Sequence, residues 1–145
     1  MNRTEIVWTQ LTWNPVSGCH PVSTECKYCY ARTLAEQKRG TLAFPFGFDV
    51  RMKPHKLNEP RKIKAASLIF VNSMSDLFLD QIPDSYRDRI LEVIRDTPKH
   101  TFQALTKRPE RAVEYFRTRR VPDNLWLGVT CGIPQAKSRI DLLRQ

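Results

Sequence analysis

Short strand-like runs alternate with amphipathic segments along this chain, and that alternation most constrains its fold. Strands that alternate with helices of about ten residues indicate βαβ units and a parallel sheet. The sequence therefore predicts an α/β fold with about four strand–helix units in a single domain over residues 1–145. The strand-like runs are residues 5–15, 68–71, 101–106 and 125–130, and the helix-like runs are residues 30–39, 84–95, 109–117 and 135–144.

Three features refine this prediction. The run Leu68–Val71 is short and largely β-branched or aromatic, as in a strand buried on both faces. Asp84 precedes a periodic apolar segment and is expected to be its N-cap. Trp8, Trp13 and Trp126 lie in predicted strands, so we expect all of them in the core.

The number of units bears on completeness. Four units would make half of an eight-fold barrel or two-thirds of a six-unit barrel. The chain ends inside a predicted helix, at IDLLRQ, without a stop signal. We therefore expect an N-terminal fragment of a parallel (β/α) barrel, with an exposed edge strand.

The basic charge suggests the class of partner. Lys and Arg number 24 against 15 Asp and Glu, which gives a net charge of +9. A surface of this charge attracts polyanions, so nucleic acid is a candidate partner. There is no apolar run of membrane-spanning length and no apolar core of a secretory signal in MNRTEIVWTQ. We expect a cytoplasmic protein that does not bind membranes.

Three of the four cysteines lie within eleven residues, between the first predicted strand and the first predicted helix. Thiolates are the usual ligands of iron–sulfur clusters, and Cys19, Cys26 and Cys29 could hold three irons of a [4Fe–4S] cluster. The fourth iron would then be open to another ligand. The aromatic ring of Tyr28 could cover the cluster and exclude water.

Zinc is the alternative metal. Cys19, Cys26 and Cys29 would form a closed tetrahedral site with a fourth ligand, either Cys131 or His20. His20 is adjacent to Cys19, which makes chelation of the same ion awkward. Cys131 follows the last predicted strand and could lie at the same rim, although a buried free thiol is its expected state. A zinc-stabilised basic module that binds nucleic acid is therefore the non-catalytic alternative to an enzyme.

Polar residues follow two of the predicted strands. Asn72–Asp76 comes directly after Leu68–Val71, where α/β folds place their sites, although Ser75 and Asp76 could also cap a turn. Thr106–Arg108 follows the next strand and could hold a phosphate or carboxylate, or face solvent. Arg117–Arg120 follows a predicted helix, and we expect it to complement the helix dipole and stay solvated.

Four segments carry a family resemblance. The cysteine loop with its Cys-x-aromatic-Cys ending resembles the opening of the radical S-adenosylmethionine (radical SAM) barrel. Six residues separate Cys19 from Cys26, whereas the usual radical SAM spacing is three, and the longer spacing is similar to that of a narrower group. That group is the phage-associated three-cysteine-motif family, also described as gp thirty-seven/gp sixty-eight-like. The resembling segments are TWNPVSGCHPVSTECKYCYA, FVNSMSDLF, LTKRPER and NLWLGVT.

The resemblance implies a fold, cofactors and a reaction. The fold would be a partial parallel (β/α) barrel of radical SAM type, with a [4Fe–4S] cluster and SAM as cofactors. Reductive cleavage of cluster-bound SAM would give a 5′-deoxyadenosyl radical that acts on an unknown substrate. The enzyme would require an electron donor, and a partner protein encoded nearby is a further expectation. The implied cluster ligands are Cys19, Cys26 and Cys29, and the implied SAM contacts are Tyr28, Asn72, Ser73, Ser75 and Asp76.

Overall fold

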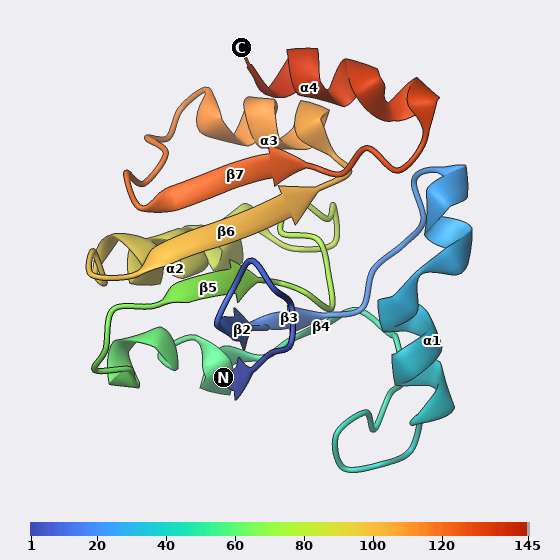
Figure 1. Cartoon of the computed structure of the whole chain (residues 1–145), viewed down its shortest axis with the longest axis horizontal. Helices are drawn as coiled ribbons and strands as arrows, with labels where there is room; N and C mark the ends of the chain where they lie inside the picture. Colours follow the sequence, from blue (N-terminus) through green and yellow to red (C-terminus); the bar gives the residue numbers. More distant parts are fainter. Residues whose placement is uncertain (145) are drawn as a thin grey trace.

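The computed structural model describes residues 1–144 and has a mixed α/β fold (Figure 1). Its main sheet has the order β1-β2-β5-β6-β7, in which all neighbours are parallel except β1, which runs antiparallel to β2. A separate antiparallel pair joins β3 to β4. The strands are β1 (Asn2–Arg3), β2 (Leu11–Trp13), β3 (Val16–Ser17), β4 (Arg51–Met52), β5 (Leu68–Val71), β6 (Thr101–Thr106) and β7 (Leu125–Val129).

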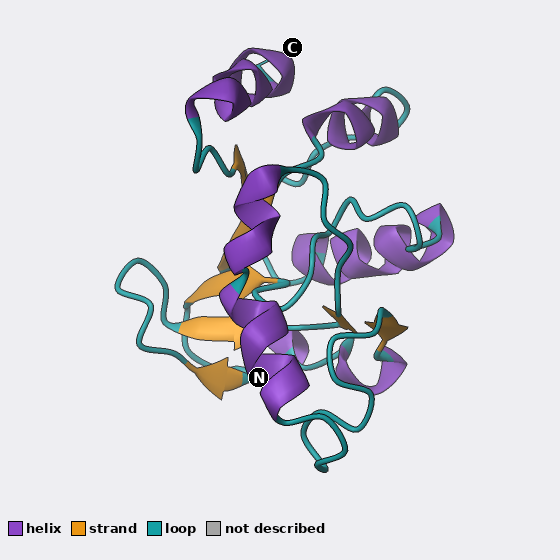
Figure 2. Cartoon of the chain, turned by 90° about the vertical axis from the view of Figure 1, so that its right-hand side faces the viewer, coloured by secondary structure: helices purple, strands orange, loops and turns teal. Residues whose placement is uncertain are grey.

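Helices α2 and α3 cover one face of the sheet and α4 lies beyond the β7 edge beside α3, whereas the first α-helix stands at the carboxyl ends of the strands. Figure 2 looks onto those ends and shows α2 and α3 on one side of the sheet, α4 above its edge and α1 in front. No helix among residues 1–144 is long and apolar enough to cross a membrane. The helices are η1 (Thr24–Tyr28), α1 (Tyr30–Gln37), η2 (Pro54–Lys56), η3 (Pro60–Lys62), α2 (Asp84–Arg95), α3 (Pro109–Phe116), η4 (Pro134–Lys137) and α4 (Ser138–Leu143).

The predicted α/β fold is confirmed, and its main sheet is parallel except for the added strand β1. Strand register explains which side chains enter the core, because Trp13, Val71 and Ala104 are paired neighbours and all point towards the helices. Phe102 is fully buried in the same layer, and truncation to alanine would cost about 3–5 kcal/mol. The described strands form an open sheet, and its relation to a barrel stays a prediction.

Three expectations about residues 1–84 are wrong. The predicted strand over residues 5–15 is shortened to β2, because a turn bonds Thr9 N to Ile6 O and lifts this segment off the sheet. Trp8 consequently leaves the core and is 42% exposed, with its ring edge against Phe70. Asp84 is not an N-cap, because Pro83 occupies that position and Asp84 begins α2.

Four expectations about the segments after α2 are also wrong. Trp126 is 61% exposed, because its register with Gln103 points it to the face that no helix covers. Cys131 lies on an exposed turn after β7 and is not a buried thiol. Arg119 is not simply solvated, because its Nε donates to Asp88 Oδ1 at 2.7 Å. The predicted helix over residues 135–144 is divided between η4 and α4.

Candidate functional site

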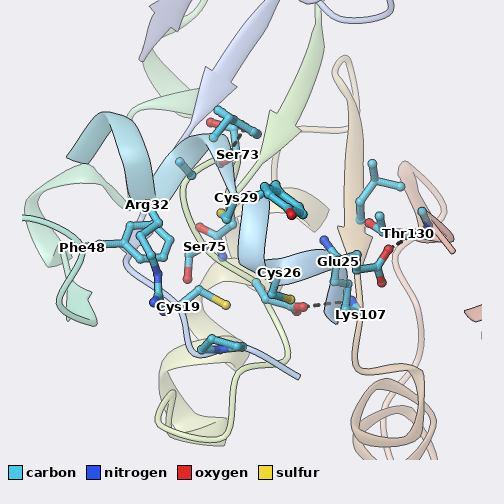
Figure 3. Close-up of a pocket in the computed structure, with 18 of the residues that line it drawn as sticks. Cys19, Glu25, Cys26, Cys29, Arg32, Phe48, Ser73, Ser75, Lys107 and Thr130 are labelled. Atoms are coloured by element: carbon cyan, nitrogen blue, oxygen red, sulfur yellow. Dashed lines mark hydrogen bonds between the residues drawn. The ribbon is translucent and has the colours of Figure 1, made fainter. Parts of the chain in front are cut away.

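A cavity of about 720 Å³ lies at the carboxyl ends of the parallel strands. The three clustered cysteines Cys19, Cys26 and Cys29 all line it, as Figure 3 shows. Its walls also contain residues that follow β5, β6 and β7, so the cavity gathers the segments that sequence analysis placed at strand ends. This is the edge where open α/β sheets bind their ligands.

The cysteine loop is anchored at its start by Gly18. This glycine has a φ of 80°, and a Cβ atom there would lie 2.3 Å from the carbonyl oxygen of Asp49. Its N–H donates to Met74 O at 2.9 Å, and its carbonyl accepts the Ser75 hydroxyl at 2.6 Å. Only glycine fits both the backbone conformation and the space. The loop before Cys19 is therefore fixed against the segment that follows β5.

The middle of the loop is tied to the C-terminal part of the chain. Glu25 accepts the backbone N–H of Gly132 at 2.8 Å and forms an ion pair with Arg139. Arg139 also donates to Thr130 O at 2.6 Å. Burial acts to raise the pKa of Glu25, but hydrogen bonds from Arg139, Gly132 and Ser23 hold it below the usual range. This ionised clamp holds η1 against the end of β7.

The pKa values of two of the cysteines are shifted in opposite directions. Burial raises the pKa of the Cys19 thiol, and the nearby Arg108 opposes that effect. Burial acts in the same direction on Cys26, but hydrogen bonds from Val22 and Ser23 lower its pKa overall. The donors beside Cys26 therefore favour its thiolate form, which is the form that binds metals, whereas burial favours the neutral thiol at Cys19.

Arg108 is buried directly behind Cys19. Its Nη1 donates to Cys19 Sγ at 3.6 Å and to Asp76 Oδ2 at 3.2 Å, and its Nη2 donates to His20 O at 2.7 Å. Its Nε is buried and has no partner among residues 1–144. Because Arg108 lines the cavity, this guanidinium brings positive charge and donor capacity to the cysteine side of the site.

Asp76 holds Arg108 in place. The Asp76 carboxylate accepts the Thr106 hydroxyl at 2.8 Å and the backbone N–H groups of Lys107 and Phe78 at 3.0 and 2.9 Å. The bond from Phe78 N is the turn cap expected of this residue. The structure therefore uses Asp76 as a buried support, and Thr106–Arg108 is joined to the cavity through it.

Asn72 ends β5 in a left-handed conformation, with a φ of 57°. Its Oδ1 accepts Val16 N at 3.3 Å, and this bond leaves the buried Nδ2 without a partner among residues 1–144. Ser73 is bonded to Asn14 through its hydroxyl, and its carbonyl accepts the Tyr30 hydroxyl at 2.6 Å. Asn72 thus lines the cavity and, like Arg108, keeps a buried nitrogen without a partner among these residues.

The sulfur atoms are gathered around the cavity rather than at one point. Among residues 1–144, no three His, Cys, Asp or Glu side chains are close enough together to hold a single metal ion. Cys131 does not line the cavity, and its thiol donates to Ala136 O at 3.2 Å. His20 lines the cavity beside Cys19.

Sequence reasoning brought Cys19, Cys26, Cys29, Tyr28 and the Asn72–Asp76 segment to this site, and all of them line the cavity except Met74. It missed the clamp between Glu25 and Arg139, which are 114 residues apart. Nothing in a single sequence pairs charges over such a separation. It also missed Arg32 and Phe48, although a basic side chain on the helix after a ligand loop is a usable signal.

Comparison with known proteins identifies a family. A family model described as "Protein of unknown function (DUF5131)" matches residues 3–145, and the chain belongs to that family. No curated protein and no solved structure matches the chain.

Proposed function

We propose that this member of the DUF5131 family is a radical SAM-type iron–sulfur protein, whose Cys19, Cys26 and Cys29 bind a [4Fe–4S] cluster. The observation that carries the proposal is that all three thiols line one cavity at the carboxyl ends of parallel strands. In the same proposal, the sheet corresponds to the N-terminal part of a radical SAM (β/α) barrel. The phage three-cysteine-motif family is the narrower group to which we assign the cysteine spacing.

The donor set fits such a cluster. Sulfur ligands of one zinc ion lie roughly 3.8 Å apart, which follows from Zn–S bonds of about 2.3 Å in a tetrahedron. A cube is bound at three separate corners and needs thiolates spread around its volume. Asn72 and Arg108, which line the cavity, each keep a buried donor without a partner among residues 1–144, and such a donor costs about 1–3 kcal/mol.

Zinc with Cys131 as fourth ligand is the weaker candidate. The Cys131 thiol already donates to Ala136 O and lies outside the cavity lining. No observation in the site favours the non-catalytic zinc module over the cluster protein.

The cavity is also of a size that suits a small molecule such as SAM. Its volume of about 720 Å³ lies within the range of small-molecule sites, about 300–1,000 Å³. When bound, SAM would supply one-electron reductive cleavage and hydrogen-atom abstraction, with an external electron donor. Phe48 is buried and provides an apolar wall that excludes water, and Asn72 of the predicted SAM-contact segment lines the same cavity.

Arg108 has a positioning role in this proposal. Its Nη1 hydrogen bond to Cys19 Sγ would persist on the ligated thiolate and reduce its electron density. Asp76 keeps the guanidinium oriented and balances its charge. The chain thereby contributes orientation and electrostatics, and leaves the redox chemistry to the cofactors.

Anaerobic reconstitution of the full chain with iron and sulfide tests the cluster. Wild type is expected to bind about four iron atoms and four sulfides per chain. The single variants Cys19→Ala, Cys26→Ala and Cys29→Ala should each lose most of the iron, whereas Cys131→Ala is the matched control and should retain it. A colourless wild type with stoichiometric zinc, or loss of metal in Cys131→Ala alone, contradicts the proposal.

Catalytic competence is a separate measurement. Reduced, reconstituted protein incubated with SAM is expected to release 5′-deoxyadenosine and methionine in equal amounts. A loaded cluster that releases neither product would leave the iron–sulfur assignment intact and remove the assignment to an active radical SAM enzyme.

A further inference from the structure

The mouth of the cysteine cavity has exposed aromatic rings from three segments of the chain. Tyr28 ends η1 and is 83% exposed, Tyr30 begins α1 and is 61% exposed, and Trp8 belongs to the loop between β1 and β2. All three line the cavity. Large aromatic side chains are rarely left in water around one opening without a binding role.

Two of these rings are held in place rather than free to rotate. The Tyr30 hydroxyl donates to Ser73 O at 2.6 Å, and the Trp8 ring packs edge-on against Phe70, with centroids 4.8 Å apart. The backbone of Trp8 is fixed as well, because its carbonyl accepts Gln103 Nε2 at 3.2 Å. Rigid rings stack on a ligand at a low cost in conformational entropy.

Two cations line the same cavity without a carboxylate partner. Neither Arg32 nor Lys107 has an acidic group within ion-pair distance in the described chain, whereas Arg108 and Glu25 are both paired. Figure 3 shows Arg32 beside Phe48 on one side of the three cysteines and Lys107 on the other. The unpaired charge of the cavity is therefore positive on both sides of the thiols.

We infer that this mouth binds single-stranded nucleic acid, with a base between the aromatic rings and the backbone phosphates at Arg32 and Lys107. Stacking platforms combined with basic side chains are the general means of binding single strands. A base stacked in a duplex cannot reach an enclosed reactive centre, which favours a single strand or an extruded base. The net charge of +9 favours approach of the polyanion.

This inference rests on the proposed function, because it names the class of substrate that would meet the cofactors. It is tested by binding rather than by turnover, on full-length protein without iron. Failure to bind single strands would leave the cluster assignment unaffected. Conversely, nucleic-acid binding by a chain that never loads iron would overturn only the proposed function.

The test compares two variants with the same loss of charge. Arg32→Gln/Lys107→Gln removes the cavity cations. Lys62→Gln/Arg117→Gln removes two exposed cations at the opposite edge of the sheet from the cavity. Lys62 ends η3, which precedes β5, and Arg117 follows α3. Binding of labelled 12-residue oligothymidylate and oligouridylate is measured by fluorescence anisotropy at several salt concentrations, with circular dichroism as the check of folding.

The cavity variant is expected to bind at least about tenfold more weakly than wild type, and its salt slope should fall by about 1.4, the value for two lost phosphate contacts on a single strand. The opposite-edge variant should stay within about twofold of wild type. Equal weakening of both variants would show diffuse attraction and overturn the site, as would tighter binding of a duplex of equal length.

The aromatic contribution has its own pair of variants. Tyr28→Ala should weaken binding about 5- to 150-fold, which corresponds to the ~1–3 kcal/mol of one base–aromatic stack. Tyr28→Phe keeps the ring and should retain wild-type affinity. Equal affinity of the two variants would contradict stacking. A mononucleotide that displaces the labelled strand at the same concentration as the unlabelled oligomer does would show that the site binds a free nucleotide instead.

Discussion

Two buried arginines show how the same side chain serves structure in one region and a site in another. Arg87 on α2 is fully buried, and its Nε and Nη2 donate to the carbonyls of Leu77, Leu79 and Ile82, while Nη1 pairs with Asp84. Every nitrogen of that guanidinium has a protein partner, so its role is complete within the fold.

Arg108 is almost as deeply buried, but its surroundings differ. It contacts a cysteine sulfur, lines a cavity and keeps one nitrogen without a partner. A protein tolerates an unmet buried donor at a cost of about 1–3 kcal/mol. The comparison teaches that burial of an arginine does not by itself distinguish the two regions, because only Arg108 contacts a cysteine sulfur and lines the cavity.

The largest effect is expected at the satisfied arginine. Arg87→Met removes the donors to three buried carbonyls and should lower the free energy of unfolding by about 3–5 kcal/mol. Urea unfolding followed by circular dichroism measures it. Arg95→Met, on the exposed side of the same helix, is the control and should cost less than ~1 kcal/mol. Similar losses in both variants would break the distinction.

A smaller loss of stability and a change in redox properties are expected at the second arginine. Arg108→Gln should cost about 1–3 kcal/mol, because Asp76 keeps its three other donors. Loss of the hydrogen bond to Cys19 Sγ should also lower the reduction potential of the reconstituted cluster. A redox titration followed by electron paramagnetic resonance measures it, with Arg111→Gln as the control. An unchanged potential would reduce Arg108 to a structural residue like Arg87.

The ion pair between Glu25 and Arg139 is expected to contribute less to stability than Arg87 and more than an exposed ion pair. The pKa of Glu25 is below the ordinary value for a glutamate. The ionised carboxylate therefore stabilises the fold above about pH 4.3, and that stabilisation is lost as the pH falls through the lowered pKa. Glu25→Gln should cost about 1–2 kcal/mol at pH 7 and progressively less below pH ~4. Urea unfolding of wild type and Glu25→Gln at several pH values measures this cost. A difference in stability that does not change with pH would contradict a role for the ionised carboxylate. The exposed Glu110→Gln is the control.

The smallest effect on stability is expected at an exposed ion pair. Arg120 and Asp123 approach within 2.9 Å but are both more than four-fifths exposed. Asp123→Asn should therefore change the free energy of unfolding by less than ~0.5 kcal/mol. Thermal unfolding at low and high salt checks this value. A larger, salt-sensitive change would mean that the surface charges of this chain act together.

Much of the fold was accessible from sequence because its elements are locally determined. The apolar run Leu68–Val71 and the amphipathic segment Asp84–Arg95 have the bounds predicted for them. The tryptophans were not predictable in the same way, because one residue of register decides which face of a strand a side chain occupies. Trp13 and Trp126 share a residue type and a strand setting, yet lie on opposite faces.

The site was only partly accessible for a related reason. The cysteines and Asn72–Asp76 were recognisable because a ligand spacing and a position after a strand are local signals. The partners of those residues come from distant segments, as Arg108 does for Cys19 and Arg139 does for Glu25. Such pairings depend on the order of the strands in the sheet, and one amino-acid sequence does not reveal that order.

The clamp also has a consequence for how the protein is made. The partners Glu25 and Arg139 are separated by 114 residues, so at about 5–20 residues per second the loop is synthesised roughly 6 to 23 s before its anchor. During that interval the thiols of a nascent chain are present but not held in their final arrangement. Any metal that needs that arrangement can therefore be bound only after the segment following β7 has left the ribosome.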